Sequence, residues 1–182
     1  MKYTQLSIPD IVILEPQVFG DHRGFFMETF RDDQFKKKVA PTVFVQDNHS
    51  KSTQGILRGL HYQIKQPQGK LVRVISGEVF DVVVDIRKSS PFFGKWSGVV
   101  LSAKNKKMLW VPSGFAHGFY VLSNAAEFTY KCTDYYAPEY ERSILWDDPS
   151  IAIDWPIIPG SSPILSQKDE NGSSLENAEV FA

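Results

Sequence analysis

The sequence predicts an all-β protein, folded as a barrel or jelly roll with a few short helices. Short apolar or alternating runs recur along the 182 residues and are bounded by Gly, Pro, Asn and Ser, as in strands joined by turns. In the clearest run, residues 78–86, apolar side chains share one face while Asp81 and Asp85 lie on the other. Many short strands with polar turns favour a closed or two-sheet β architecture.

The strands are expected where alternating or apolar runs lie between turn residues. In chain order they are Ile11–Leu14, Gly24–Thr29, Thr42–Val45, Ile56–Gln63, Leu71–Ser76, Glu78–Ile86, Trp96–Ser102, Lys107–Val111, Gly118–Leu122 and Phe128–Thr133. One helix is expected at Asp32–Val39, because an aspartate lies at its start and three lysines lie toward its end. No internal repeat is present, so residues 1–182 are expected to form a single domain. The tail after Asp169, rich in Ser, Asn, Gly and Glu, is expected to be loosely held.

The composition narrows the class of protein. A net charge of −1 gives no electrostatic footprint for nucleic acid. The single cysteine, Cys132, excludes an internal disulfide and fits a reducing compartment. The first apolar cluster, Ile11–Leu14, is short and lacks the cationic flank of a signal peptide, and no run approaches the ~20 apolar residues of a membrane span. We therefore expect a soluble cytoplasmic protein with no nucleic-acid or membrane partner.

Two histidine motifs indicate a small β-barrel that has lost a metal. Metal-binding barrels often carry Gly-x5-His-x-His in one strand and Pro-x-Gly-x2-His further on. Gly55 and His61 keep the first spacing, but Gln63 replaces its second histidine, and the following residues 65–68 include no acidic ligand; the second motif ends at His117. Two histidines without a carboxylate or thiolate make an incomplete site for a typical metal. The sequence thus predicts no metal, and leaves His61 free to act as a general base.

If the strand face of His61 is the barrel interior, two further side chains are candidates to accompany it. Lys70 alternates with valines in its strand, and Tyr130 shares a face with Phe128 and Cys132. A lone histidine in a strand is more often a satisfied core residue, and Tyr130 alone reads as a core aromatic. A lysine, however, is almost never fully buried unless it is paired. Lys70 therefore lies at a barrel mouth or has a function.

Arginines and amides at turn positions suggest contacts with an anion and a base. Arg23, in a turn before Glu28, belongs either to an ordinary charged hairpin or to a phosphate site, since the planar guanidinium suits phosphate. Residues 46–48 form either a polar turn or a set of amides that read a base edge. Simple alternation puts Arg58 on the face opposite His61 unless Gly59 introduces a bulge, which the sequence leaves open.

These residues carry a resemblance to a known family. The segments that occur in register are Gln46–Ser50, Arg58–Gln63, Asp81–Arg87, Pro112–Phe119, Tyr130-Lys131 and Leu165–Asp169. Over about Phe19 to Asp169 the chain resembles the dTDP-4-dehydrorhamnose 3,5-epimerases of the dTDP-L-rhamnose pathway, whereas Pro-x-Gly-x2-His alone suggests only a cupin-type barrel. The resemblance implies a cupin-type jelly-roll homodimer that needs no metal or organic cofactor. Its implied substrate is dTDP-4-dehydro-6-deoxy-D-glucose.

The resemblance also implies roles for individual residues. His61 matches the proton acceptor, Asp169 the carboxylate paired with it, Tyr130 the proton donor, and Lys70 the cation near the keto oxygen of the sugar. The positions that match substrate contacts are Arg23, Glu28, Gln46, Asn48, Arg58, His117, Glu141 and Lys168, with Tyr136 as an aromatic near the nucleotide and sugar.

The expected chemistry explains why such residues are needed. A 4-keto group acidifies the hydrogens on C3 and C5, so inversion without a redox cofactor needs a base on one face of the sugar and an acid on the other. Three other functions stay open at this point. They are a metal-dependent cupin oxygenase or isomerase, against which Gln63 argues; a sugar-binding barrel without catalysis; and a sister enzyme that acts at C3 or C5 only or isomerises a related keto sugar. His117 is either part of the site or a relic of the lost metal site.

Overall fold

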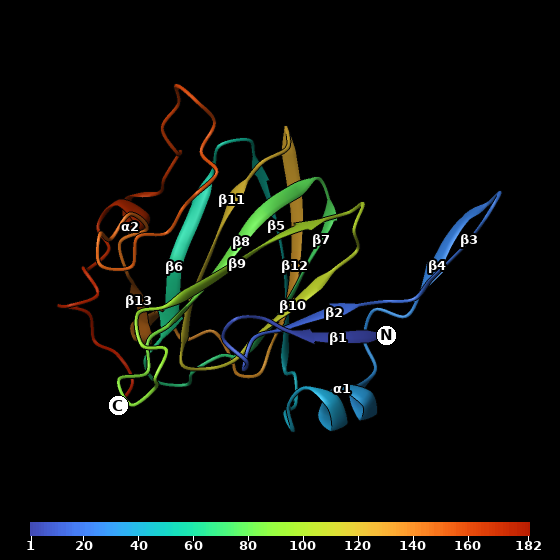
Figure 1. Cartoon of the computed structure of the whole chain (residues 1–182), viewed down its shortest axis with the longest axis horizontal. Coiled ribbons are helices and arrows are strands. Elements are labelled where there is room, and N and C mark those ends of the chain that lie inside the picture. The colour runs from blue at the N-terminus through green and yellow to red at the C-terminus, as the bar shows by residue number, and fades with distance from the viewer.

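The fold is an antiparallel barrel of two sheets, described over residues 1–182 by a computed structural model (Figure 1). The larger sheet contains, in spatial order, β1 (Lys2–Gln5), β2 (Val12–Glu15), β10 (Met108–Val111), β7 (Lys70–Ser76), β12 (Ala125–Cys132) and β5 (Gln46–Thr53). The smaller sheet contains β13 (Glu141–Ser143), β6 (Leu57–Gln63), β11 (Phe115–Val121), β8 (Glu78–Asp85) and β9 (Trp96–Ser102). The barrel architecture expected from the short alternating runs is confirmed.

The main core lies between the two sheets. Its 15 buried residues include Val72 and Phe128 from the larger sheet and Val83 and Phe119 from the smaller one. Two other apolar clusters lie outside the barrel: one covers the outer face of the smaller sheet, and the other lies under α1 (Asp32–Lys38). The apolar side chains that point between the sheets thus form the core beside which the polar residues of a site lie.

The expected strands mostly agree with the observed ones, and one does not. Trp96–Ser102 and the helix at Asp32 are found as expected, but the strand expected at Thr42–Val45 is wrong. The strand begins at Gln46 instead, and its sequence QDNHSKST is polar throughout. Its inward-facing residues line a pocket rather than the apolar core, so it lacks the usual hydrophobic alternation.

The C-terminal segment is also packed more closely than expected. It contains α2 (Gln167–Glu170), and beyond it Leu175 is buried while Val180 and Phe181 pack against the apolar cluster on the smaller sheet. Phe181 pairs with Arg87 in an isolated parallel bridge. Scattered apolar residues anchor this polar tail, which composition alone does not reveal. A single 3-10 turn, η1 (Pro138–Tyr140), precedes β13.

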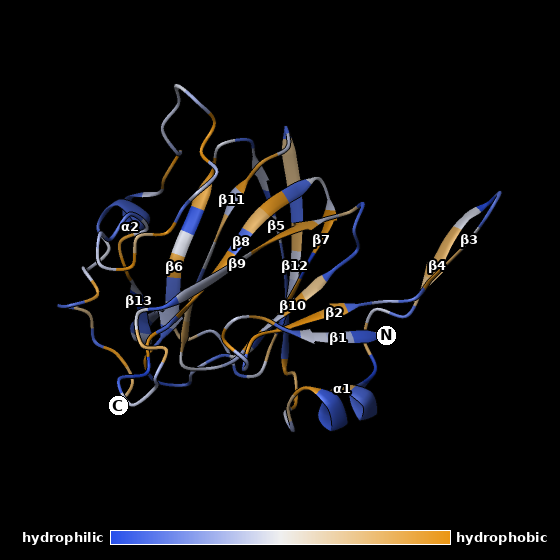
Figure 2. Cartoon of the chain, in the orientation of Figure 1, coloured by the Kyte–Doolittle hydropathy of each residue, from blue (hydrophilic) through white to orange (hydrophobic).

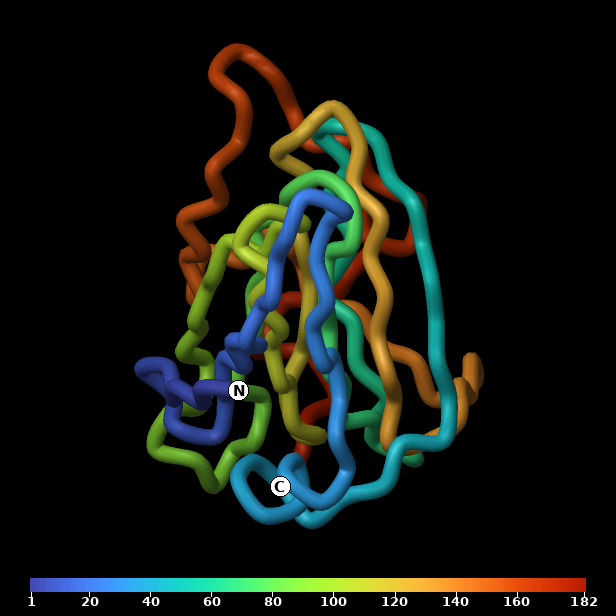
Figure 3. Tube along the Cα trace, turned by 90° about the vertical axis from the view of Figure 1, so that its right-hand side faces the viewer, coloured from blue at the N-terminus to red at the C-terminus, as the bar shows by residue number.

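A separate hairpin, β3 (Val18–Asp21) and β4 (Gly24–Met27), projects from the barrel on the side away from α2 (Figures 1 and 3). It carries four exposed apolar side chains: Val18, Phe19, Phe25 and Phe26. Figure 2 shows the apolar colour of β4 on this isolated ribbon. An exposed apolar patch of this kind marks an interaction surface. No helix of the fold is long and apolar enough to cross a membrane.

Candidate active site

A pocket of about 310 Å³ opens between the two sheets. Its lining combines amides, phenols, a histidine, a lysine and a carboxylate. The lining residues are Gln46, Asn48, His61, Tyr62, Gln63, Gln68, Lys70, Tyr130, Tyr136 and Glu141. Seven of the residues singled out from the sequence therefore share one pocket: Gln46, Asn48, His61, Lys70, Tyr130, Tyr136 and Glu141.

The larger sheet supplies one wall. Lys70 on β7 lies opposite Cys132, which in turn lies opposite Gln46 on β5. Two residues earlier on β12, and on the same face, Tyr130 lies opposite both Val72 and Asn48. Since Val72 belongs to the core between the sheets, this row of side chains points into the barrel, as alternation predicts.

The smaller sheet supplies the opposite wall, and a bulge shapes it. His117 pairs with His61, whereas Phe119 pairs with Arg58, so β6 holds one residue more than β11 over this stretch. The bulge turns Arg58 to the same side as His61, where its Nε donates to Ser52 Oγ at 3.0 Å. Gly59 is required there, because a Cβ would lie 2.5 Å from Gly118 Cα. Simple alternation would have put Arg58 on the face opposite His61, and the bulge is the reason that it does not lie there.

His61 forms a tight pair with Asp169. Its Nε2 lies 2.6 Å from Asp169 Oδ1, which also accepts the Gly59 N–H at 3.0 Å. The second oxygen of Asp169 accepts from the hydroxyl and backbone N–H of Ser166, in a capping box that begins α2. The carboxylate is thus held from two sides before it orients the imidazole.

The protonation states suit a base and an acid. Burial lowers the pKa of His61 more than Asp169 raises it, so the ring is neutral and free to accept a proton. Although burial alone would raise the pKa of Asp169, its bonds to His61, Ser166 and Gly59 lower it. Burial, followed by nearby Cys132, raises the pKa of Tyr130, so that phenol keeps its proton at neutral pH.

A charged rim closes the pocket on one side. Glu141 accepts from Lys168 Nζ at 2.8 Å and from the Tyr136 hydroxyl at 3.1 Å. The Tyr136 backbone N–H donates to Gln46 at 2.9 Å. Lys70, by contrast, forms no ion pair and no side-chain hydrogen bond with the protein, and burial lowers its pKa.

A second histidine–carboxylate pair lies deeper. His117 Nε2 is 2.8 Å from Asp81 Oδ1, and both side chains are buried. Asp81 was not among the residues expected at the site. The sequence does indicate that Asp81 is buried, because it alternates with Val79 and Val83 in a strand whose other face is apolar too. A carboxylate at such a position is buried and needs a partner.

Gln63 is fully engaged by the backbone. Its Nε2 donates to the carbonyls of Gln66 and Tyr135, and its Oε1 accepts the N–H of Ala137. The residue that replaces the motif's second histidine therefore positions a loop at the edge of the pocket.

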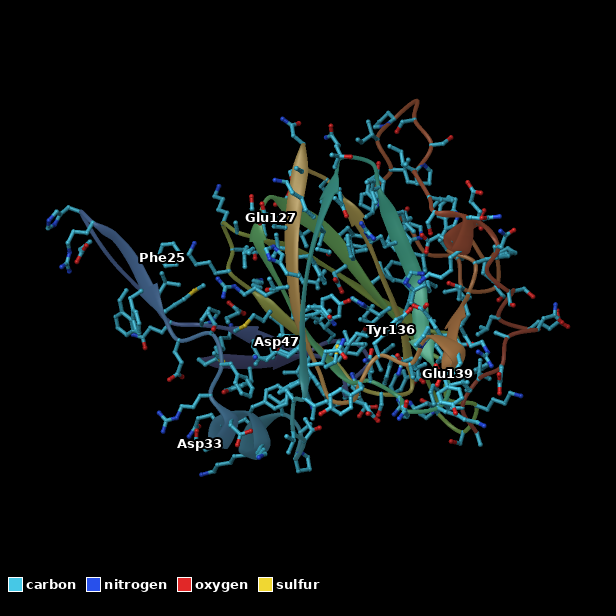
Figure 4. The ribbon with its side chains drawn as sticks, turned by 180° about the vertical axis from the view of Figure 1, so that it is seen from behind. Phe25, Asp33, Asp47, Glu127, Tyr136 and Glu139 are labelled. Carbon is cyan, nitrogen blue, oxygen red and sulfur yellow. The ribbon has the colours of Figure 1, made fainter.

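Two of the expected site residues lie elsewhere in this chain. Arg23 is exposed at the hairpin tip and bonds Asp21, and Glu28 is exposed just after β4. Figure 4 shows Phe25 of the hairpin and Tyr136 of the pocket on opposite sides of the molecule. The pocket of one chain thus lacks both residues.

Nearly the whole chain is similar to one group of enzymes. Residues 5–177 match the family model described as dTDP-4-dehydrorhamnose 3,5-epimerase. The chain is 57% identical over 182 residues to the dTDP-4-dehydrorhamnose 3,5-epimerase of Pseudomonas aeruginosa, covering 100% of this chain and 99% of that one.

Solved structures of dTDP-sugar epimerases are also similar to nearly the whole chain. The dTDP-6-deoxy-D-glucose-3,5-epimerase of Legionella pneumophila Philadelphia 1, in complex with dTDP-4-keto-L-rhamnose, matches with a TM-score of 0.95 and 52% identity, over 98% of this chain and 94% of that chain. A 3'-monoepimerase from Streptomyces bikiniensis, in complex with dTDP-quinovose, matches with a TM-score of 0.87 and 35% identity, over 94% and 87% of the two chains.

Proposed function

The chain belongs to the family of dTDP-4-dehydrorhamnose 3,5-epimerases, and we propose that its pocket inverts C3 and C5 of dTDP-4-dehydro-6-deoxy-D-glucose through enolate intermediates. The product is dTDP-4-dehydro-L-rhamnose. The observation that carries the proposal is the placement of His61 and Tyr130, which line one pocket from opposite sheets. A sugar ring between them would meet a base on one face and an acid on the other.

Each inversion then consists of two proton transfers. The imidazole of His61 takes the proton from the carbon next to the ketone, and the electron pair of that C–H bond moves into an enolate. Tyr130 gives its phenolic proton to the same carbon from the opposite face, and solvent restores both groups. Asp169 orients the His61 ring and stabilises its charged form, as a carboxylate does beside histidine in other enzymes.

The enolate oxygen needs a cation in place. Lys70 carries an ammonium with no protein partner, so it can bind the C4 oxygen as negative charge develops there. His117 lies directly across from His61 in the sheet and supports the same region. Because Gln63 is occupied by backbone groups, we propose that the reaction needs no metal and no organic cofactor.

The nucleotide is bound, in this proposal, by a homodimer. Gln46, Asn48, Tyr136 and Glu141 line the pocket of one chain, Lys168 bonds Glu141, and Arg58 lies on the same side of β6 as His61. Arg23 and Glu28 reach the pocket of the second copy, carried there by the exposed apolar hairpin. Support comes from the outer face of the larger sheet, where a pocket of about 290 Å³ is lined by Phe30, Leu71 and Arg73, whose Nε is sealed from solvent without a partner. Arginine is enriched among the residues that contribute most to binding at interfaces, so this surface suits a second copy of the chain.

Proton NMR of the reaction in deuterium oxide tests the proposed function. We expect the wild-type protein to place deuterium at both C3 and C5 and to yield the L-lyxo sugar, before and after exhaustive chelation. Deuterium at one carbon only would instead indicate a mono-epimerase, and activity that disappears on chelation and returns with one metal would overturn the metal-free mechanism.

Subunit complementation tests the placement of Arg23. In a dimer formed from Arg23→Ala and His61→Ala chains, one pocket keeps its own His61 and receives Arg23 from the other chain. We therefore expect the co-expressed mixture to be active, although each variant alone binds dTDP weakly or does not turn over.

The matched control combines Arg58→Ala with His61→Ala. Arg58 and His61 lie on the same strand of one chain and are proposed to serve the same pocket, so every mixed dimer lacks one or the other at each pocket. This mixture should stay inactive. Equal behaviour of the two mixtures would show that Arg23 does not act across the dimer.

A further inference from the structure

The side chain of Asp81 is a carboxyl group enclosed inside the barrel. It is fully buried on β8, on the face that points between the two sheets. One oxygen, Oδ1, is bonded to His117 Nε2. The other, Oδ2, is sealed from solvent and has no hydrogen-bond partner. Most buried polar atoms have at least one hydrogen-bond partner, so this unpaired oxygen calls for an explanation.

The unpaired cation whose charge acts on Asp81 is Lys70. Burial first, and then the charges of Cys132, Glu141, Asp81 and Lys168, shift the pKa of Lys70. Burial raises the pKa of Cys132, so at neutral pH that group is a thiol without charge. The charge of Glu141 is already matched by Lys168 at 2.8 Å. Asp81 therefore remains as the carboxyl group coupled to Lys70 that has no lysine or arginine partner of its own.

The two groups influence each other across the barrel. Burial lowers the pKa of Lys70, and the negative charge of Asp81 opposes that effect. The pKa of Asp81 is raised, because burial outweighs the opposing effects of His117 and then Lys70. The charge of each group thus favours the charged form of the other, and Lys70, which bonds no group of the protein, stays free to bind another oxygen.

His117 is fixed in the same arrangement. An ionised Asp81 accepts the proton on Nε2, which leaves Nδ1 as the ring nitrogen without a partner in the protein. His117 also stacks on Phe128 with ring centroids 6.2 Å apart. The ring is thus held by a carboxylate at one edge and an aromatic face at its side, directly across from His61.

We propose that Asp81 is a positioning residue for the epimerisation, which holds the His117 ring and supplies the negative charge that keeps Lys70 an ammonium beneath the C4 oxygen. This inference rests on the proposed function, because it concerns the enolate that forms during the proposed epimerisation. Asp81 does not reach the substrate itself. It acts through His117 and Lys70, by maintaining the electrostatic field into which the enolate charge develops.

The variant Asp81→Asn tests the proposal, because the amide oxygen can still accept from His117 while the charge is lost. We expect kcat to fall at least tenfold while the affinity for dTDP changes little. Loss of the anion makes Lys70 easier to deprotonate, so the basic limb of the kcat–pH profile should move to lower pH. Lowering the pH should therefore restore part of the lost rate, which a purely structural defect would not do.

The control is Asp85→Asn, which removes a buried carboxylate from the same face of the same strand. Asp85 bonds Arg87 and Ser90 and lies outside the pocket. We expect it to lower the melting temperature without moving kcat or the basic limb. If Asp81→Asn behaves like Asp85→Asn, or loses dTDP affinity in proportion to its rate, the proposal is wrong.

Two further measurements keep the outcome decisive. In a Lys70→Gln background, Asp81→Asn should cost much less rate than in the wild type, because the residue through which it acts is gone; full additivity would contradict the proposal. If Asp81→Asn does not fold, Asp81→Glu replaces it, and a basic limb that moves despite the retained charge would overturn the proposal. The wild-type NMR assay is run first, so that failure of the proposed function is seen separately.

Discussion

Replacing His61 with alanine is expected to lower kcat by at least the ~10²–10⁴-fold that a positioned general base contributes. The affinity for dTDP should be nearly unchanged, because the proposed nucleotide contacts lie on other residues. The fold should also survive, since Asp169 keeps its bonds to Gly59 and Ser166 after the imidazole is gone. Turnover of the dTDP-4-keto sugar and equilibrium binding of dTDP measure the two quantities separately.

His49→Ala is the matched control for this variant. His49 also lies near a carboxylate, Glu127 at 3.2 Å, but it is exposed and outside the pocket. Its replacement should leave kcat unchanged. Near-normal turnover in His61→Ala would place the base elsewhere in the pocket.

The pH dependence of the wild-type activity gives an independent test of His61 as the base. Since the pKa of His61 is lowered below its ordinary 6.5, the ring stays neutral to lower pH than a free imidazole. Activity that needs this neutral base should persist below pH 6.5 and be lost as the pH falls through the lowered pKa. An acid limb above pH 6.5 would contradict the assignment.

Tyr130→Phe is expected to separate proton removal from inversion. Proton removal needs only His61 and stabilisation of the enolate, whereas inversion needs an acid on the opposite face. Deuterium from solvent should therefore still enter the sugar, while formation of the L-lyxo product falls sharply. The Tyr130 hydroxyl forms no hydrogen bond with a protein group, so its loss leaves no buried partner unpaired, and the variant should fold normally.

The comparison for Tyr130 is a tyrosine that belongs to the core. Tyr120 is fully buried, and its hydroxyl accepts the N–H of Ile158 at 3.3 Å outside the pocket. Tyr120→Phe should lose stability, by roughly 0.5–1.5 kcal/mol for one hydrogen bond, and keep its double epimerisation. If Tyr130→Phe makes the L-lyxo sugar at the normal rate, water or another side chain is the acid.

The sequence predicted the inward residues of regular strands well, and irregular features poorly. Lys70, Val72 and Val74 were placed on one face because a strand has a period of two, and they lie there. The side of Arg58 was not predictable, because it depends on one extra residue in β6 opposite β11. Such a bulge depends on the close approach of Gly59 to Gly118, which involves a distant part of the chain.

Polar residues inside the barrel were the other source of error. Strand β5 reads as a turn because its inward side chains, such as Gln46 and Asn48, line the pocket instead of a dry core. Asp81 was seen as an alternating polar residue, but its pairing with His117 follows from the register of β8 against β11. In both strands, polar residues that belong to the site occupy inward positions where a strand normally has apolar residues, and secondary-structure prediction depends on that apolar pattern.

The capping box at Ser166 joins catalysis to local stability. Asp169 both closes the first turn of α2 and holds His61, so a transient opening of residues 166–170 would withdraw the carboxylate while the ladders of both sheets stay paired. The population of competent enzyme is then governed by the free energy of this small opening rather than by global unfolding. On heating, catalytic loss would therefore precede the melting of the barrel, and backbone amides of α2 would exchange with solvent before those of β6.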